Sequence, residues 1–436
     1  MTTNDFPRLH GPRLADVLGR RVQDMPLTRM RRRHDDVPPS VDPEQATTTA
    51  LRDHLDAVQP GQTVAIGVGS RGIKSIAAVV AAAVRALHER GAEPFVVPAM
   101  GSHGGSTAEG QAKTLAGLGI TEASVGAPVR ATMETVALGM ADDVDVAFDA
   151  NALTADHILV INRLKSHTSF TGEIESGLAK MLTIGLGKQH GAEELHRFGP
   201  ADVERRVTTA ARFICAQLPV LGGIALVEGL TKQLVAAELV PAAGIGGSRE
   251  AELLRLAKTQ EARLPVHRID VLVVDAMGKE YSGTGMDTNV LGRRMVRSMP
   301  ELESPDVTQI VCLEVDPESN GNAMGIGLAD FVPERALAGF DLSTTYANAL
   351  TAGSQGVQRA QIPIVLRDNV DAVSGAILTS EVTDLSRLRL ARIRNTLELD
   401  EILVSEPLVA EASGTYEAVP ADPVMLFGTA GRLGEW

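Results

Sequence analysis

Short apolar, β-branched runs alternate with longer alanine- and valine-rich stretches in the first half of the chain. The first pair predicts a strand over residues 63–66 and a helix over residues 75–90. Further strands are expected over residues 95–97 and 157–162, each followed by a loop rich in glycine or polar residues. This strand–loop–helix order is typical of a parallel sheet, whose ligands bind where strands end at their carboxyl termini.

The second half of the chain begins with a new strand, expected over residues 269–275, just after Pro265. We therefore expect a domain boundary near residue 265, with domains over residues 1–265 and 266–436. The predicted fold class is α/β, with two α/β domains that contain parallel or mixed sheets and a cleft between them.

Two segments show no clear periodicity and are predicted to be irregular. The first is residues 1–45, which include a basic run at residues 29–34. That run is interpreted as a solvated segment, or else as a contact for a phosphate, a carboxylate or another subunit. The second segment, residues 405–422, is predicted to be a loop.

Composition narrows the class of protein. Of 436 residues, 44% are hydrophobic and 22% charged, which excludes a disordered chain, a collagen and a simple coiled coil. A net charge of −14 and only 3% aromatic residues argue against nucleic acid as a partner. The two cysteines, Cys215 and Cys312, are too few for a disulfide framework, a thiolate zinc site or an iron–sulfur cluster.

No apolar run approaches the roughly 20 residues that span a bilayer. The N-terminus also lacks the apolar stretch of a secretory signal. We therefore expect a soluble, cytoplasmic protein without a membrane partner.

The first candidate for chemistry is the loop Gly67-Val68-Gly69-Ser70-Arg71-Gly72, which has the form G-x-G-x-x-G. Taken alone it indicates a dinucleotide site, and hence an NAD(P)-dependent oxidoreductase. However, the next strand runs into Pro98 without the acidic residue that would hold a ribose. Arg71 suggests instead a single phosphate or carboxylate, and a mere tight turn is the third possibility.

Histidines and lysines form the remaining candidates. His103 lies among glycines and serines, where its imidazole suits proton transfer, although a surface-loop histidine is the plain alternative. A denser group lies within residues 167–196: His167, Lys180, Lys188, His190 and His196. Imidazoles can bind nickel, zinc, copper or iron, and a lysine can contact phosphate or tether a cofactor. The alternative is a helix with solvated charges.

Taken together, these motifs resemble the lactate racemase family of nickel-pincer nucleotide-dependent enzymes. The resemblance rests on Gly69-Ser70-Arg71, Gly101-Ser102-His103, His167, Ser176-Gly177-Leu178-Ala179-Lys180 and a downstream histidine. It implies two α/β domains and an isomerase that racemises or epimerises the C2 carbon of a 2-hydroxy acid. It also implies a cofactor, the pyridinium-3-thioamide-5-thiocarboxylic acid mononucleotide carrying nickel, and partner proteins that synthesise it.

The resemblance also implies roles for individual residues. His103 and His167 correspond to the two acid/base histidines, and Lys180 to the lysine that is joined to the cofactor. His196 corresponds to the nickel ligand, with His190 as the alternative. Ser70, Arg71 and Gly177 belong to motifs that bind the cofactor, and Arg71 also corresponds to a substrate contact.

The chain departs from the family pattern in three places. The gap of 13 residues from His167 to Lys180 is longer than in the family. Val68 stands where the first loop of the family has an acidic residue. The second domain lacks a Gln-x-x-Lys element, so Lys279 or Arg293 is the expected cation for the substrate carboxylate. We therefore expect a larger or more polar 2-hydroxy acid than lactate.

Three other functions stay open on the sequence alone. One is the NAD(P)-dependent oxidoreductase that uses the Gly67 to Gly72 loop. A second is a metal-dependent hydrolase built on histidines, although no H-E-x-x-H motif is present. The third is a cofactor carrier or sensor without turnover.

Overall fold

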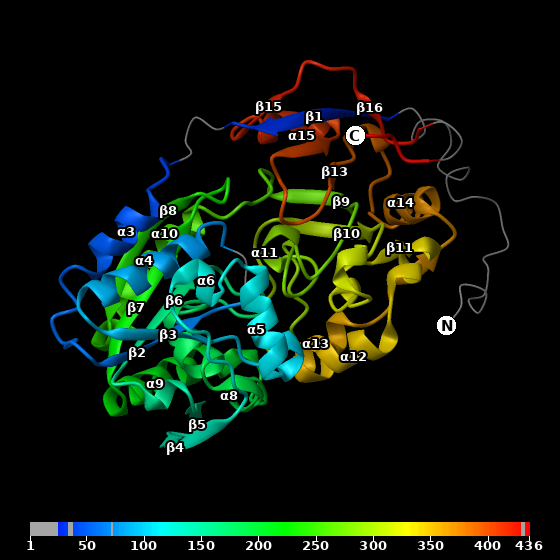
Figure 1. Ribbon diagram of the computed structural model, residues 1–436. Coiled ribbons are helices and arrows are strands. Elements are labelled where there is room, and N and C mark those ends of the chain that lie inside the picture. Colours follow the sequence, from blue (N-terminus) through cyan, green and yellow to red (C-terminus); the bar gives the residue numbers. More distant parts are fainter. Residues whose placement is uncertain (1–24, 34–37, 71–72, 429–431) are drawn as a thin grey trace. The chain divides into compact units, whose positions relative to one another are not determined.

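The computed structural model describes residues 25–33, 38–70, 73–428 and 432–436. The chain divides into two compact units, one of which is Val37–Glu261 and the other Ala262–Trp436 together with the described residues 25–33. Both units combine sheets with helices, so the predicted α/β fold class is confirmed (Figure 1). Within the described ranges, no helix is both long enough and apolar enough to cross a membrane.

The unit of residues 37–261 is built on a five-stranded sheet of order β3-β2-β6-β7-β8 among its described residues. The strands are β2 (Thr63–Val68), β3 (Glu93–Pro98), β6 (His157–Arg163), β7 (Val220–Glu228) and β8 (Leu234–Pro241). The first four are parallel, whereas β8 runs antiparallel to β7. Val68 pairs with both Pro98 and Ile161, so β2, β3 and β6 end at the same edge of the sheet.

Helices on either side of this sheet bury its apolar residues. Alternate residues of β2, Val64 and Ile66, pack with the apolar face of α4, where Val80 and Leu87 are buried. This follows from the period of two in a strand and of 3.6 in a helix. The helices of the unit are α3 (Pro43–Leu51), α4 (Ile76–Glu89), α5 (Ala108–Gly117), α6 (Glu122–Val125), α7 (Leu178–Lys180), α8 (Lys188–His196), α9 (Val203–Gln217) and α10 (Ser248–Thr259).

A separate antiparallel hairpin extends from this unit. It consists of β4 (Thr135–Ala141) and β5 (Val144–Asp149), and β5 packs against α8. In Figure 1 the hairpin lies beside α8 and α9. The hairpin therefore adjoins the segment that was predicted to carry the cofactor.

The other unit contains a nine-stranded mixed sheet among the described residues. Five neighbouring strands are parallel: β12 (Ile364–Leu366), β11 (Phe331–Pro333), β10 (Asp306–Cys312), β9 (Arg268–Val274) and β13 (Leu390–Ile393). The antiparallel part consists of β14 (Glu401–Val404), β1 (Pro26–Arg32), β15 (Tyr416–Ala418) and β16 (Val424–Met425). Its helices are α11 (Thr288–Leu291), α12 (Leu342–Thr351), α13 (Ser354–Arg359), α14 (Asn369–Leu378) and α15 (Glu406–Ala412).

Two sequence-based expectations about irregular segments were wrong. Residues 29–32 of the basic run lie in strand β1, in which Leu27 and Met30 are fully buried and Arg31 pairs with Glu401, while residue 34 lies outside the described residues. The segment 405–422 contains α15 and β15 rather than only loop. In both places the missing information was a strand partner far away in the sequence, because β1 pairs with β14 and β15.

The position of β1 also differs from the predicted domain ranges. The range 1–265 placed the N-terminal segment with the first domain, whereas β1 lies in the sheet of the unit formed by residues 262–436. Hydrogen bonding across the sheet, which pattern along the chain does not encode, decides this membership.

Candidate active site

The candidate site lies at the edge where β2, β3 and β6 end. Ser70 follows β2 by two residues and His103 follows β3 by five. A hydrogen bond of 2.5 Å joins the Oγ atom of Ser70 to the Nδ1 atom of His103. The structure thus brings together two residues that the sequence placed in separate glycine-rich loops. Arg71 lies outside the described residues.

The lysine turn adjoins these loops. The backbone N–H of Gly101 donates to the carbonyl oxygen of Gly185, which ends the π-helical turn Met181–Gly185 after Lys180. A Cβ atom placed on Gly69 would lie 3.5 Å from the side chain of Met181. The loops that carry Ser70, His103 and Lys180 are therefore in contact with one another.

Gly177 and Glu250 shape the turn that carries Lys180. The buried Glu250 accepts hydrogen bonds from the backbone N–H groups of Leu178 and Ala179 through one oxygen, at 2.6 and 3.2 Å. A Cβ atom on Gly177 would lie only 2.4 Å from that oxygen. The glycine of the Ser-Gly-Leu-Ala-Lys motif is therefore required by the close approach of a carboxylate that caps the turn.

His196 lies within the electrostatic field of Lys180. Burial chiefly, and then the positive charge of Lys180, lower the pKa of His196 to about 4, while a hydrogen bond to the backbone of Ala192 opposes them. At neutral pH the imidazole is therefore uncharged, which is the form that binds metals. A ring held through one nitrogen by a backbone group is also typical of metal-ligating histidines.

The competing histidine, His190, has different surroundings. It is exposed, and its Nε2 atom lies 3.4 Å from a carboxylate oxygen of Asp145 on β5.

His167 is held by residues of its own loop after β6. Its Nδ1 atom accepts the backbone N–H of Ser169 at 3.1 Å, and its ring stacks on Phe170 with centroids 4.3 Å apart. Its backbone N–H donates to Glu175, which pairs with Lys258. Because Nδ1 is an acceptor, the proton of the neutral ring is on Nε2.

The two predicted substrate cations lie in the unit of residues 262–436 and make local contacts there. The Nζ atom of Lys279 donates to the carbonyl oxygen of Gly283 at 2.7 Å. Arg293 donates to Asp330 at 2.7 Å and to backbone carbonyls of Leu328, Val307 and Thr308. These contacts give Arg293 a structural role, and its role toward a substrate stays a prediction.

The sequence reasoning missed several residues that position the site. Besides Glu250, they include Gln111 on α5, which contacts the His103 loop, and Lys188, whose buried side chain contacts Gln111. Lys188 was singled out only as a member of the dense cluster. A signal was present for it, since a lysine follows two closely spaced glycines, but its partners are far away in the sequence.

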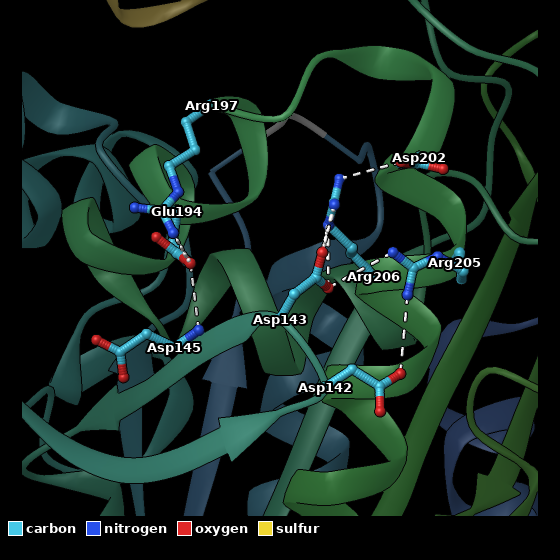
Figure 2. A network of polar contacts seen from close by, with 8 residues as sticks. All are labelled: Asp142, Asp143, Asp145, Glu194, Arg197, Asp202, Arg205 and Arg206. Carbon is cyan, nitrogen blue, oxygen red and sulfur yellow. Dashed lines mark hydrogen bonds and ion pairs between the residues drawn. The ribbon is translucent and has the colours of Figure 1, made fainter.

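A charged network fixes the end of α8 to the β4–β5 hairpin (Figure 2). Arg206 on α9 pairs with Asp143 and Asp202, and its guanidinium lies 3.6 Å from the ring centroid of Phe198. Glu194 accepts the backbone N–H of Asp145 and pairs with Arg197. Figure 2 shows the charged residues of this network, including Arg197 and Asp202.

Within the described ranges, no group of three or more histidine, cysteine, aspartate or glutamate side chains is placed to hold a metal ion by itself.

Comparison with known proteins gives a family model for part of the chain. Residues 68–246 match the domain of unknown function DUF362. The match begins at the end of β2 and includes Ser70, His103, Lys180 and His196. No curated protein matches the chain. A crystal structure of a Thermotoga maritima protein, a structural genomics target, is similar at 16% identity with a TM-score of 0.42, covering 63% of this chain and 72% of that one.

Proposed function

We propose that this protein is a racemase or epimerase that inverts the hydroxyl-bearing C2 carbon of a 2-hydroxy acid, with a nickel-pincer nucleotide joined to Lys180. The observation that supports it most is the arrangement at the carboxyl edge of the sheet. There, burial and then the charge of Lys180 lower the pKa of His196, and in the adjoining loops Ser70 is hydrogen-bonded to His103.

The residues fit such a cofactor in their donor chemistry. A thioamide and a thiocarboxylate bring soft sulfur ligands of their own, so one imidazole from the chain adds the nitrogen ligand that nickel accepts. The uncharged imidazole of His196 supplies this ligand. The amine of Lys180 provides the covalent attachment.

When bound, the cofactor would supply a reversible acceptor for the hydride of C2. The chain supplies protons and position. His103 and His167, which both contact the protein through Nδ1, would take or give the hydroxyl proton of the substrate. A pair of such bases serves an enzyme that acts on both stereoisomers. Arg71 would neutralise the substrate carboxylate, and the roles of Lys279 and Arg293 toward a substrate stay predictions from the sequence.

The oxidoreductase alternative receives less support from the strand that follows the Gly67 to Gly72 loop. Strand β3 ends at Pro98, whose carbonyl oxygen accepts a hydrogen bond from the buried amine of Lys188. A carboxylate that would hold a ribose is not at this position.

The proposal is tested on protein produced together with the cofactor-synthesis proteins. We expect nickel in the purified protein, the mass of the cofactor on the peptide that contains Lys180, and stereochemical exchange of a 2-hydroxy acid. The matched controls are Lys180→Arg, which should lose the added mass, and the pair His196→Ala and His190→Ala. Only the first of that pair should lose nickel.

An unmodified Lys180 in active protein would overturn the covalent attachment. Nickel lost from His190→Ala but retained in His196→Ala would exchange the two histidines. Tight NADH binding in a fluorescence titration, with turnover that needs no nickel, would favour the oxidoreductase instead.

A further inference from the structure

Lys188 is an unusual residue for the start of a helix. Its side chain is fully buried, and its Nζ atom lies 2.9 Å from Asp149 at the end of β5. The same amine donates to the carbonyl oxygen of Pro98 and, at 3.0 Å, to the side-chain oxygen of Gln111. Three elements, β3, α5 and β5, therefore meet at one ammonium group.

Gln111 connects this amine to the His103 loop. Its side-chain oxygen accepts from Lys188, while its nitrogen donates to the carbonyl oxygens of Gly101 and His103, at 2.8 and 3.3 Å. Gln111 is fully buried as well. The amide is thus oriented by Lys188 so that its N–H groups face the backbone on both sides of Ser102.

The backbone of Lys188 indicates that the side chain is needed there. Its φ angle is +54°, in the left-handed region that favours glycine. The neighbouring Gly187 and Gly191 pack tightly on Thr183. Glycine thus stands at nearby positions of this segment, whereas position 188 has a lysine. A non-glycine residue held in this conformation is typical of functional positions.

We propose that Lys188 and Gln111 form a buried hydrogen-bonded link, here called the relay, between the first turn of α8 and the His103 loop. The relay holds this loop in place, and with it the contact between His103 and Ser70. Lys188 and Gln111 are positioning residues, since they act on His103 through its backbone. The consequence for turnover rests on the proposed function, whereas the orientation of His103 does not.

The sharpest variant is Gln111→Glu, which keeps the size of the side chain and the oxygen that accepts from Lys188. It replaces the N–H donors by an oxygen that faces two carbonyl oxygens, so the His103 loop should be released. The measurement is NMR of isotope-labelled histidine in cofactor-free protein, with the His103 ring signals assigned from His103→Gln. Ser70→Ala provides the position of those signals when the hydrogen bond to Ser70 is lost.

We expect the His103 ring signals of Gln111→Glu to move to the position found in Ser70→Ala. The control Gln217→Glu, an isosteric change at an exposed residue at the end of α9, should leave them in place. In protein loaded with cofactor, Gln111→Glu should lower turnover by about 10²-fold, as expected when a reacting group is misplaced by an ångström.

Unchanged His103 signals in folded Gln111→Glu would overturn the relay, even if the protein proves to be a racemase. Shifted signals support the relay, even if no 2-hydroxy acid is turned over. Should Gln111→Glu fail to fold, the double variant Lys188→Met with Asp149→Asn removes both buried charges together. It keeps the side-chain oxygen that accepts the N–H of Ala152, and it must shift the His103 signals for the relay to stand.

Discussion

At the scale of single residues, buried polar groups do most to shape the loops of the site. Glu250 accepts N–H groups of Leu178 and Ala179 through one oxygen and of Gly246, at 2.8 Å, through the other. Burial raises the pKa of this carboxyl group above its ordinary value, although the three hydrogen bonds oppose the effect. Burial of the Glu250 carboxylate, which caps the turn before Lys180, therefore costs electrostatic free energy.

The raised pKa of Glu250 makes stability depend on pH. Between the ordinary value near 4.5 and the raised value, the folded protein binds a proton that the unfolded chain has released, so the free energy of unfolding falls as pH rises. The side chain in Glu250→Gln has no carboxyl group and does not bind this proton. We expect the variant to gain stability relative to the natural chain as pH rises from about 4.5, by about 1.4 kcal/mol for each unit by which the pKa is raised.

Urea unfolding between pH 4 and pH 8 measures the difference between the two proteins. Glu252→Gln, a change on the exposed face of the same helix, is the control and should follow the natural chain. Parallel curves for Glu250→Gln and the natural chain would contradict the raised pKa.

At the scale of elements, α8 is held along strand β5 at both of its ends. Lys188 at its start pairs with Asp149, and Glu194 near its end accepts the N–H of Asp145. The network of Figure 2 continues from there to α9 through Arg206. These contacts of the β4–β5 hairpin with α8 and α9, here called the brace, hold α8, the helix that ends at His196.

Arg206 is the part of this brace that we expect to matter most. Its side chain is only 7% exposed, stacks on Phe198 and lowers the pKa of Asp143 to about 2, chiefly through its hydrogen bond. Arg206→Met should speed hydrogen exchange in β4, in β5 and in residues 197–202, while the central strands stay protected.

The neighbouring Arg205 gives a matched control. Its side chain is 49% exposed, and its contacts with Asp142 and Asp143 are 3.7 and 3.5 Å long. Exposed pairs of this kind contribute little, so Arg205→Met should leave exchange unchanged. Equal effects of the two variants in mass-spectrometric hydrogen exchange would show that the burial of Arg206 is irrelevant.

At the scale of the whole molecule, an N-terminal strand completes a sheet whose other strands follow residue 262. In β1, Met30 is fully buried in the same core cluster as Ile402 of β14 and Tyr416 of β15. The stability of this unit therefore depends on residues that precede the other unit in the sequence.

We expect Met30→Ala to destabilise the unit of residues 262–436 by about 2–5 kcal/mol, because it leaves a cavity in a packed core. Leu87→Ala, at an equally buried position of α4, should destabilise the unit of residues 37–261 instead. Hydrogen exchange resolved by peptide identifies the unit affected. Loss of protection in residues 37–261 of Met30→Ala would contradict the assignment of β1.

The sequence determined the local elements of the parallel sheet well. The helix expected over residues 75–90 is α4 (Ile76–Glu89), and the strand expected over 157–162 is β6 (His157–Arg163). Hydrophobic period and glycine-rich loops fix such elements, because both act over a few residues. The α/β fold class followed from their order along the chain.

Only the tertiary structure decided which distant groups meet. It paired β1 with β14 and β15, capped the turn before Lys180 with Glu250, and placed Gln111 between Lys188 and the His103 loop. Sheet partners and buried hydrogen bonds join residues far apart in the sequence, and a buried polar group must find its partner wherever the fold offers one. Residue type and spacing therefore indicated which side chains carry chemistry, whereas packing decided what holds them in place.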